Sequence, residues 1–149
     1  MTNTADTIRI AINAVHQRAR VALDARNLEL YLSFLHPRLL YIKTDGVTLG
    51  KQDIGRDVRR QFANAHVVRT SFRQQSFAVT SDGATEVLEQ DIEFVVRAFG
   101  FVRREWNVTR RGRYDWIHDG EAWRIKRIEV ASEKTSSRWY LAWPRALAT

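Results

Sequence analysis

The first part of the chain carries apolar residues at helical spacing. Between about residues 6 and 25 this spacing predicts an amphipathic helix whose buried stripe is Ile8, Ile12, Val15, Ala19 and Leu23. A short second helix is predicted in NLELYLSFLHP, with Asn27 as its N-cap and Pro37, which lacks an amide hydrogen, beyond its end. The run LLYIKTDG then predicts a strand that ends in a turn. A third helix is predicted in GKQDIGRDVRRQF, where Ile54, Val58 and Phe62 share a face.

The period of the apolar pattern then changes from helical spacing to two. Four long runs of alternating residues are separated by Ser81-Asp82-Gly83, Gly100 and His118-Asp119-Gly120, all of which are turn signals. Helices followed by a meander of strands indicate an α+β domain. We therefore predict a cone-like, curled antiparallel sheet packed on about three N-terminal helices.

The alternation also predicts which face of the sheet is buried. The even-numbered residues from Leu88 to Ala98 share the inward face, and pairing extends that face to neighbouring strands. The parity of apolar residues reverses between Ile125 and Ile128, so we expect a β-bulge near Lys126 or Arg127. The aromatic residues of the hairpin RYDWIHDGEAWRIKRIEV are expected to point inward. The polar inward residues are Gln74, Gln90, Arg104 and Arg110.

Two interpretations of these inward polar residues remain open. A polar group buried without a partner is costly, so these side chains need an explanation. In the first interpretation they lie at strand ends or form hydrogen bonds with helix carbonyls. In the second they line a cavity between the sheet and the helices. In the second interpretation the candidate ligand-binding residues are Tyr41, Phe62, Gln74, Gln90, Phe94, Trp106, Arg110 and Tyr114. No residue is assigned a catalytic role.

The outward face carries an acidic row, Glu89, Asp91 and Glu93, opposite Arg73 and Arg111. Such a row is typical of a solvated face with cross-strand ion pairs, and it equally suits a dimer surface. By parity, an apolar patch lies on the same face: Phe77, Val79, Val87 and Val95. An apolar patch surrounded by charges predicts a homodimer through the outer sheet face.

Composition narrows the function classes. The chain has 149 residues, no cysteine, a hydrophobic fraction of 44% and a net charge of +7. No run is long enough for a membrane span, and we expect a cytoplasmic location. The basic residues are spread among acids, so we do not expect nucleic-acid binding. The four histidines are scattered along the sequence, so no metal site is expected: His16, His36, His66 and His118. The sequence also lacks phosphate-binding loops and nucleophile elbows, and no cofactor is expected.

The end of the chain, SSRWYLAWPRALAT, reads as a separate aromatic tail. We therefore divide the chain into a domain at residues 1–135 and a tail at 136–149. Trp139, Tyr140, Leu141 and Trp143 are too apolar to remain in water. Three interpretations are open: packing on the chain or a dimer partner, a lid over the cavity, or stacking of nucleic-acid bases.

Two stretches resemble the nuclear transport factor 2-like superfamily, which includes ketosteroid isomerases, scytalone dehydratase and polyketide (SnoaL-like) cyclases. VALDARNLELYLSFLHPRLLYIKTDGVTLGKQDI resembles its two helices, first strand and lysine-led third helix, and GRYDWIHDGEAWRIKRIEV resembles its closing hairpin. The resemblance covers about residues 6 to 133 and is architectural. Lys43 and Ala19 stand where ketosteroid isomerases carry a general-base Asp and a Tyr donor.

The resemblance implies a small-molecule-binding protein with a cavity between the curled sheet and the helices. Its ligand would be an apolar molecule with a carbonyl or acid group, and an isomerase- or lyase-type reaction is open. The alternative is a non-catalytic association module, because the superfamily also contains oligomerisation domains.

Overall fold

The computed structural model describes residues 4–141, apart from the side chains of His66, Val67, Ala98 and Phe99. Three helices occur where they were predicted, namely α1 (Thr4–Asp24), α2 (Leu28–Ser33) and α3 (Lys51–Asn64). Asn27 caps α2, since its side chain accepts a hydrogen bond from the Leu30 amide at 3.1 Å. After α2 the strand β1 (Leu35–Ile42) begins at once, and Gly46 then turns the chain with a φ of +85°.

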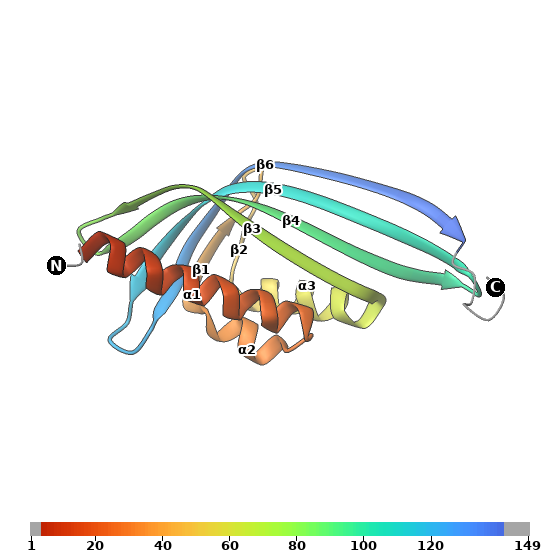
Figure 1. The fold of residues 1–149 in the computed structure, drawn as a ribbon, viewed down its shortest axis with the longest axis horizontal. Helices are drawn as coiled ribbons and strands as arrows, with labels where there is room; N and C mark the ends of the chain where they lie inside the picture. The colour runs from red at the N-terminus through yellow and green to blue at the C-terminus, as the bar shows by residue number, and fades with distance from the viewer. Residues whose placement is uncertain (1–3, 142–149) are drawn as a thin grey trace.

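The sheet has six strands in the order β2-β1-β6-β5-β4-β3. Four long strands form the predicted antiparallel meander: β3 (Ala65–Val79), β4 (Gly83–Phe99), β5 (Val102–His118) and β6 (Trp123–Leu141). The sheet as a whole is mixed, because β1 pairs in parallel with β6, and β2 (Thr48–Leu49) only extends β1. The helices cover one face of one half of the sheet (Figure 1). The α+β cone is therefore confirmed.

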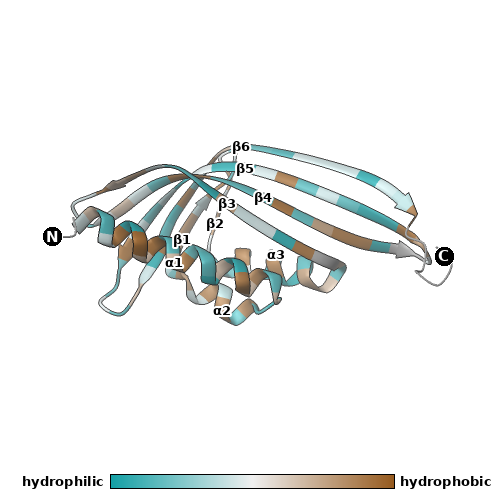
Figure 2. Ribbon diagram, in the orientation of Figure 1, coloured by the Kyte–Doolittle hydropathy of each residue, from teal (hydrophilic) through white to brown (hydrophobic). Residues whose placement is uncertain are grey.

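The core lies between α1 and the half of the sheet beneath it. Ile12, Val15 and Ala19 of α1 are buried, as their spacing predicted, and they pack with Leu88 and Trp116 of the sheet. The hydropathy colouring shows hydrophobic segments recurring along α1 between hydrophilic ones (Figure 2). Alongside α3 and past its end the strands β4, β5 and β6 continue as what we call the distal arm, residues 92–99, 102–110 and 133–141.

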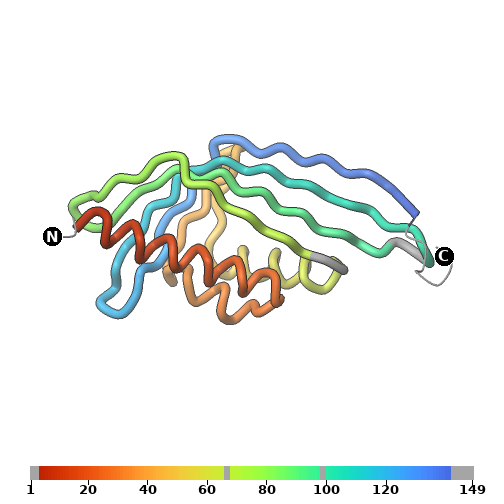
Figure 3. The backbone as a smooth tube through the Cα atoms, in the orientation of Figure 1, coloured from red at the N-terminus to blue at the C-terminus, as the bar shows by residue number. Residues whose placement is uncertain are grey.

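β-Bulges bend the long strands and change which residues face inward. Lys126 is an extra residue in β6, since Asp115 pairs with Arg127 and Trp116 with Ile125, which confirms the bulge predicted there. A second extra residue, Ala131, follows in the same strand. The tube view shows all four long strands bending together (Figure 3).

A bulge at Gln75 corrects the prediction for β3. Ser76 pairs with Val87 and Phe77 with Glu86, so the register shifts by one residue after Gln74. Phe77 consequently packs against the core, and Val79 pairs with the buried Ala84. Neither residue belongs to the outer apolar patch in which parity alone had placed it.

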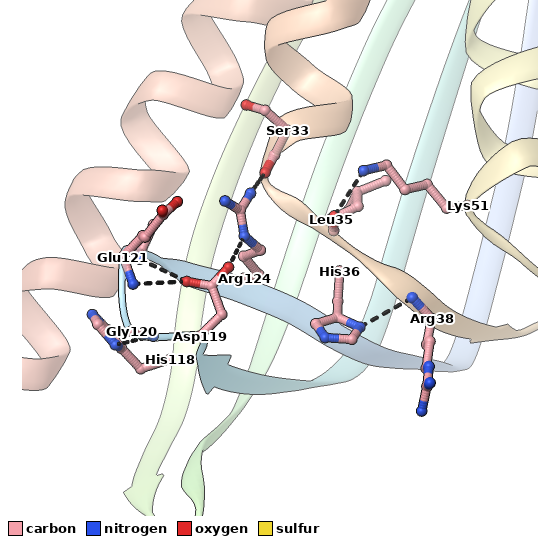
Figure 4. A network of polar contacts seen from close by, with 11 residues as sticks. Ser33, Leu35, His36, Arg38, Lys51, His118, Asp119, Gly120, Glu121 and Arg124 are labelled. Atoms are coloured by element: carbon pink, nitrogen blue, oxygen red, sulfur yellow. Dashed lines mark hydrogen bonds and ion pairs between the residues drawn. The ribbon is translucent and has the colours of Figure 1, made fainter.

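Polar contacts fix the closing hairpin to the helices (Figure 4). The Arg124 guanidinium donates to both the Asp119 carboxylate in the hairpin turn and the Ser33 carbonyl at the end of α2. Lys51, the first residue of α3, donates from Nζ to the Leu35 carbonyl at 3.1 Å. The Arg124 hydrogen bond, with backbone donors from the turn, holds the pKa of Asp119 well below its usual range.

Residues 136–141 of the predicted tail form the end of β6 and pair with the start of β5. Trp139 and Leu141 are both 58% exposed. Trp143 and Pro144 lie outside the described residues, and the division at residue 135 stays a prediction. Within residues 4–141, no helix combines the length and apolar character needed to cross a membrane.

Candidate functional site

A pocket of about 230 Å³, the inner pocket, lies between the sheet and the three helices. It is lined by side chains from α1, α2 and α3 and from the inward face of the sheet. Its apolar walls are formed by Leu23, Leu49, Ile54, Val58, Val68, Ile92 and Val130. Its polar lining consists of Tyr31, Tyr41, Lys43, Thr44, Asp57, Gln61, Thr70, Gln90, Arg110 and Glu133.

Arg110 is the central charge of the inner pocket. Its Nε donates to Glu133 Oε2 at 2.8 Å, its guanidinium carbon lies 5.9 Å from the centre of the Tyr41 ring, and its side chain is 22% exposed. A weaker contact at 3.5 Å leads from Nη1 to Gln90 Oε1. Burial by itself lowers the pKa of Arg110, but Tyr41, Tyr114 and Glu133 outweigh burial and raise it above its ordinary value. The guanidinium therefore stays charged.

Two phenols beside Arg110 stay protonated. Burial raises the pKa of Tyr41 to about 12, and burial also raises the pKa of Tyr31, although Arg110 opposes both shifts. A protonated phenol is a hydrogen-bond donor, so the pocket offers neutral donors next to a fixed positive charge. Thr70 adds a buried hydroxyl on the same wall, and this oxygen has no hydrogen-bond partner in the described part of the chain.

A wide second pocket, the outer groove, lies between α3 and the distal arm, with a volume of about 970 Å³. Phe94 and Trp106 line it as a stacked pair, with ring centres 6.1 Å apart and planes 12° apart. The Arg104 guanidinium lies 4.1 Å from the Trp106 ring centre and 5.0 Å from that of Trp139. Four residues line both pockets: Asp57, Gln61, Ile92 and Arg110.

A third polar cluster, which sequence reasoning missed, is buried between α1 and β4. His16 Nε2 lies 2.5 Å from Glu86 Oε1, and their side chains are 8% and 0% exposed. The His16 ring packs edge-on against Trp116, with ring centres 5.1 Å apart. The signal was present in the sequence, because the parity that placed Gln90 inward also places Glu86 inward. His16 lies beside Val15 on the apolar stripe of α1.

The structure places the predicted site residues in three separate groups. Tyr41, Gln90 and Arg110 line the inner pocket, whereas Phe94 and Trp106 line the outer groove, which Arg110 also reaches. The other three predicted residues, which line neither pocket, are Phe62, Gln74 and Tyr114.

Gln74 and Tyr114 belong to the His16–Glu86 cluster. Gln74 accepts from Arg9 at 2.9 Å and donates weakly to Asn13 and Glu86, and Tyr114 is the cross-strand neighbour of Glu86. Phe62 is half-buried on α3, and its carbonyl accepts from Arg26 at 3.4 Å. For all eight residues the ligand-binding role stays a prediction.

The outer face of the sheet carries cross-strand ion pairs. Arg73 donates to Glu89, as the facing charges predicted, and Thr109 donates to Asp91 at 2.9 Å. Arg69 and Glu93 approach to 4.0 Å. In the described chain, no group of three or more histidine and carboxylate side chains is arranged to hold a metal ion.

Comparison with solved structures identifies the fold, although no family model and no curated protein matches the chain. A provisionally assigned scytalone dehydratase from Novosphingobium aromaticivorans superposes with a TM-score of 0.71 at 14% identity, covering 97% of both chains. A provisionally assigned dehydratase of the NTF2-like family from Streptomyces avermitilis gives a TM-score of 0.65 at 13% identity, covering 84% of this chain and 96% of its own.

A type 2 hexachlorocyclohexane dehydrochlorinase, LinA, is also similar, with a TM-score of 0.60 at 14% identity, over 91% of this chain and 93% of its own. The chain therefore has the nuclear transport factor 2-like fold, as the two sequence stretches predicted. Identities this low establish architecture, whereas function has to be argued from the site.

Proposed function

We propose that the protein binds a small apolar molecule with a carbonyl or carboxylate group, whose oxygen is held by Arg110 in the inner pocket. The observation that carries this proposal is a charged, largely buried guanidinium beside protonated phenols in a pocket that also has apolar walls. Charge-assisted donors of this kind favour an oxygen with negative or partially negative charge. The Thr70 hydroxyl, which has no hydrogen-bond partner among the described residues, supplies a further polar atom for the same ligand.

Pairing with Glu133 shapes the choice of ligand. The Glu133 carboxylate already neutralises Arg110, with 2.8 Å between Glu133 Oε2 and Arg110 Nε. A neutral carbonyl can therefore bind Arg110 without displacing Glu133, whereas a carboxylate ligand competes with Glu133 for the guanidinium. Both ligand types leave the apolar part of the molecule against Leu23, Ile54 and Val130. The volume, below the roughly 300–1,000 Å³ of drug-sized sites, limits what fits inside to about a single ring.

An isomerase- or lyase-type reaction is the catalytic form of this proposal. Arg110 and the two phenols would stabilise the negative charge that develops on a carbonyl oxygen when a neighbouring carbon loses a proton. Asp57 lines the pocket with a carboxylate that makes no hydrogen bond or ion pair within the described chain, so it is the residue placed to take that proton. Two structural neighbours carry dehydratase names and a third is a dehydrochlorinase, which favours elimination chemistry.

The test uses benzoate as the acid and acetophenone as the ketone, with binding measured by calorimetry and thermal shift. Arg110→Met combined with Glu133→Gln removes the charge without leaving a lone carboxylate. It should weaken binding of the better probe about 10- to 100-fold, the usual value of a hydrogen bond to a charged group.

Arg111→Met is the matched control, because Arg111 is the next residue of β5 and is exposed on the opposite face. It should bind like wild type. Equal binding by wild type and the Arg110 double variant would refute the role of Arg110, and failure of both probes to bind wild type would refute the proposed function.

A homodimer formed through the outer sheet face is the second proposal. After the correction of Phe77 and Val79, the apolar residues of that face include Val87 and the buried Val95, at the two ends of the acidic row on β4, and the exposed Leu40 on β1. Apolar side chains beside cross-strand ion pairs on one face of a sheet support an interface between copies of the chain. Such a dimer corresponds to the non-catalytic association module considered above. It is compatible with ligand binding, because the ligand would bind on the opposite, inner face of the sheet.

A further inference from the structure

One edge of β6 has no partner strand along the distal arm. β1 pairs with β6 only from Ile125 to Glu129, whereas β5 pairs with β6 as far as Leu141. On the side away from β5, no strand of the described chain pairs with residues 132–141, which run along the margin of the distal arm (Figure 1). This stretch, the free edge, spans about 30 Å and presents a row of backbone N–H and C=O groups without a strand to bond.

The free edge lacks most of the features with which proteins protect an edge strand, such as a short length, a proline or a bulge. After the bulge at Ala131 it pairs regularly with β5, and it contains no proline. Two of its charges are already neutralised, since Glu133 is bound to Arg110 and Arg138 to Glu105. The side chains at its middle are small, hydroxyl-bearing and exposed: Thr135, Ser136 and Ser137. The free edge is therefore open to an additional strand.

The sequence of the free edge restricts how it can pair with the same edge of a second copy. Antiparallel two-fold pairing keeps inward residues opposite inward ones, so the axis passes beside a single residue. An axis at Ser136 puts Lys134 opposite Arg138 of the second copy, and an axis at Arg138 puts two arginines opposite each other, both of which are unfavourable. An axis before Ser136 brings the end of β6 against residue 129, which already pairs with Ile42. An axis beyond Arg138 pairs, among the described residues, 137–141 at most.

We propose that the free edge pairs antiparallel with the free edge of a second copy about a two-fold axis at Ser137, so that the two sheets become one. This axis pairs residues 133–141 of each copy and places no like charges opposite each other. Thr135 then lies opposite Trp139, which is 58% exposed in the single chain, and Lys134 lies opposite Tyr140. Both are favourable cross-strand neighbours, and backbone hydrogen bonds along the edge supply the affinity.

This interface goes beyond the proposed ligand binding and is separate from the outer-face dimer. It uses the edge of β6 rather than the face of the sheet, and Glu133 is its one residue among those that line the inner pocket. One strand from each copy buries less than the roughly 1,200–2,000 Å² of a stable interface. We therefore expect edge pairing at protein concentrations of about 100 µM, well above the low micromolar range in which a standard interface forms.

Disulfide cross-linking tests the axis, because the chain has no cysteine of its own. In Ser137→Cys the two Cβ atoms lie about 4.5–5.5 Å apart across the axis, close to the span of a disulfide, so mild oxidation should give a covalent dimer. In Ser136→Cys the two cysteines are diagonal neighbours about 7–8 Å apart, and cross-linking should be about tenfold slower. Ser81→Cys, exposed in the turn between β3 and β4, measures cross-linking by random collision.

A pair of opposite charges at position 136 tests the register independently. Ser136 is exposed and lies opposite Arg138 of the second copy in the proposed pairing. In the Ser137→Cys chain, Ser136→Lys places two pairs of like charges across the interface and should slow cross-linking about tenfold. Ser136→Glu is the matched control and should not slow it, whereas an effect on folding alone would be similar for both substitutions.

The outcomes decide the proposal without reference to any ligand. Cross-linking of Ser137→Cys no faster than that of Ser81→Cys overturns it, and so does faster cross-linking of Ser136→Cys than of Ser137→Cys. Equal rates in Ser136→Lys and Ser136→Glu also overturn it. The Ser137→Cys measurement is repeated with Val87→Glu, which is designed to remove the outer-face dimer. A retained cross-link supports the edge interface, whereas its loss shows that the outer-face dimer had brought the cysteines together and overturns the proposal.

Discussion

Glu86 and His16 form a buried hydrogen-bonded pair that can be recognised only when the packing of α1 against β4 is known. Glu86 is 1% exposed, and its carboxylate is satisfied by the His16 ring at 2.5 Å and by a weak contact from Gln74. The acid lies on the inward face by simple alternation, and the histidine lies on a helical stripe. Their meeting depends on how α1 crosses β4, which neither local pattern contains.

Replacement of Glu86 should therefore be costly in a way that surface acids are not. Glu86→Ala leaves a cavity and a buried imidazole without its partner, and we expect it to lower the free energy of unfolding by about 3 kcal/mol. Glu86→Gln keeps an acceptor for the ring and should cost about 1 kcal/mol. Urea unfolding measures both.

Glu89→Gln is the control at the same strand, because Glu89 pairs with an exposed Arg73 on the outer face. It should change stability by less than about 1 kcal/mol. Equal effects of Glu86→Ala and Glu89→Gln would contradict the importance given to the buried pair.

At the scale of elements, the strands approach each other closely where β4 begins. A Cβ atom added to Gly83 would lie 1.9 Å from the Trp116 carbonyl oxygen of β5, so the backbone itself would have to move. Gly83→Ala should therefore destabilise the protein by about 2–3 kcal/mol, the range of strong overpacking, as measured by thermal or urea unfolding.

Gly46→Ala offers a contrast, because no atom lies within 4 Å of its added Cβ and only its φ of +85° opposes a side chain. It should cost about 1 kcal/mol. A milder effect at Gly83 than at Gly46 would show that the strands separate easily at this point.

The helices, the four long strands and the bulge at Lys126 were all predictable from the sequence, because each leaves a periodic signal in a continuous stretch. The bulge at Gln75 was not, since Phe77 and Val79 alternate just as well on the wrong face. The parallel pairing of β1 with β6 joins residues far apart in the chain, such as Tyr41 and Ile128. The separation of Phe94 and Trp106 from the inner pocket likewise depends on the curvature of the sheet, which no local pattern specifies.

At the scale of the whole molecule, the homodimer proposal leads to a direct measurement. Light scattering at low micromolar concentration should give roughly twice the chain mass of 17.4 kDa. Val87→Glu replaces an apolar side chain of the outer face with a charge and should give the monomer mass, because a charge buried in an interface is costly. Val21→Glu, at a residue that is 59% exposed on α1, away from the outer sheet face, is the control and should remain dimeric. A monomeric wild type would refute the interface.

The two bulges of β6 have a consequence for insertions and deletions. Ile125 is inward at an odd number, Ile128 and Val130 are inward at even numbers, and Glu133 is inward at an odd number again, because Lys126 and Ala131 each reverse the parity. Loss of Lys126 or Ala131 alone would remove only the extra residue, so the residues on both sides would keep their faces in a regular strand that has lost one bend. Loss of a regularly paired residue such as Arg124 would instead shift one side of the strand by one position, turning its apolar residues to water and its charges inward. The two bulges are therefore the positions at which a change in the length of this strand does least damage.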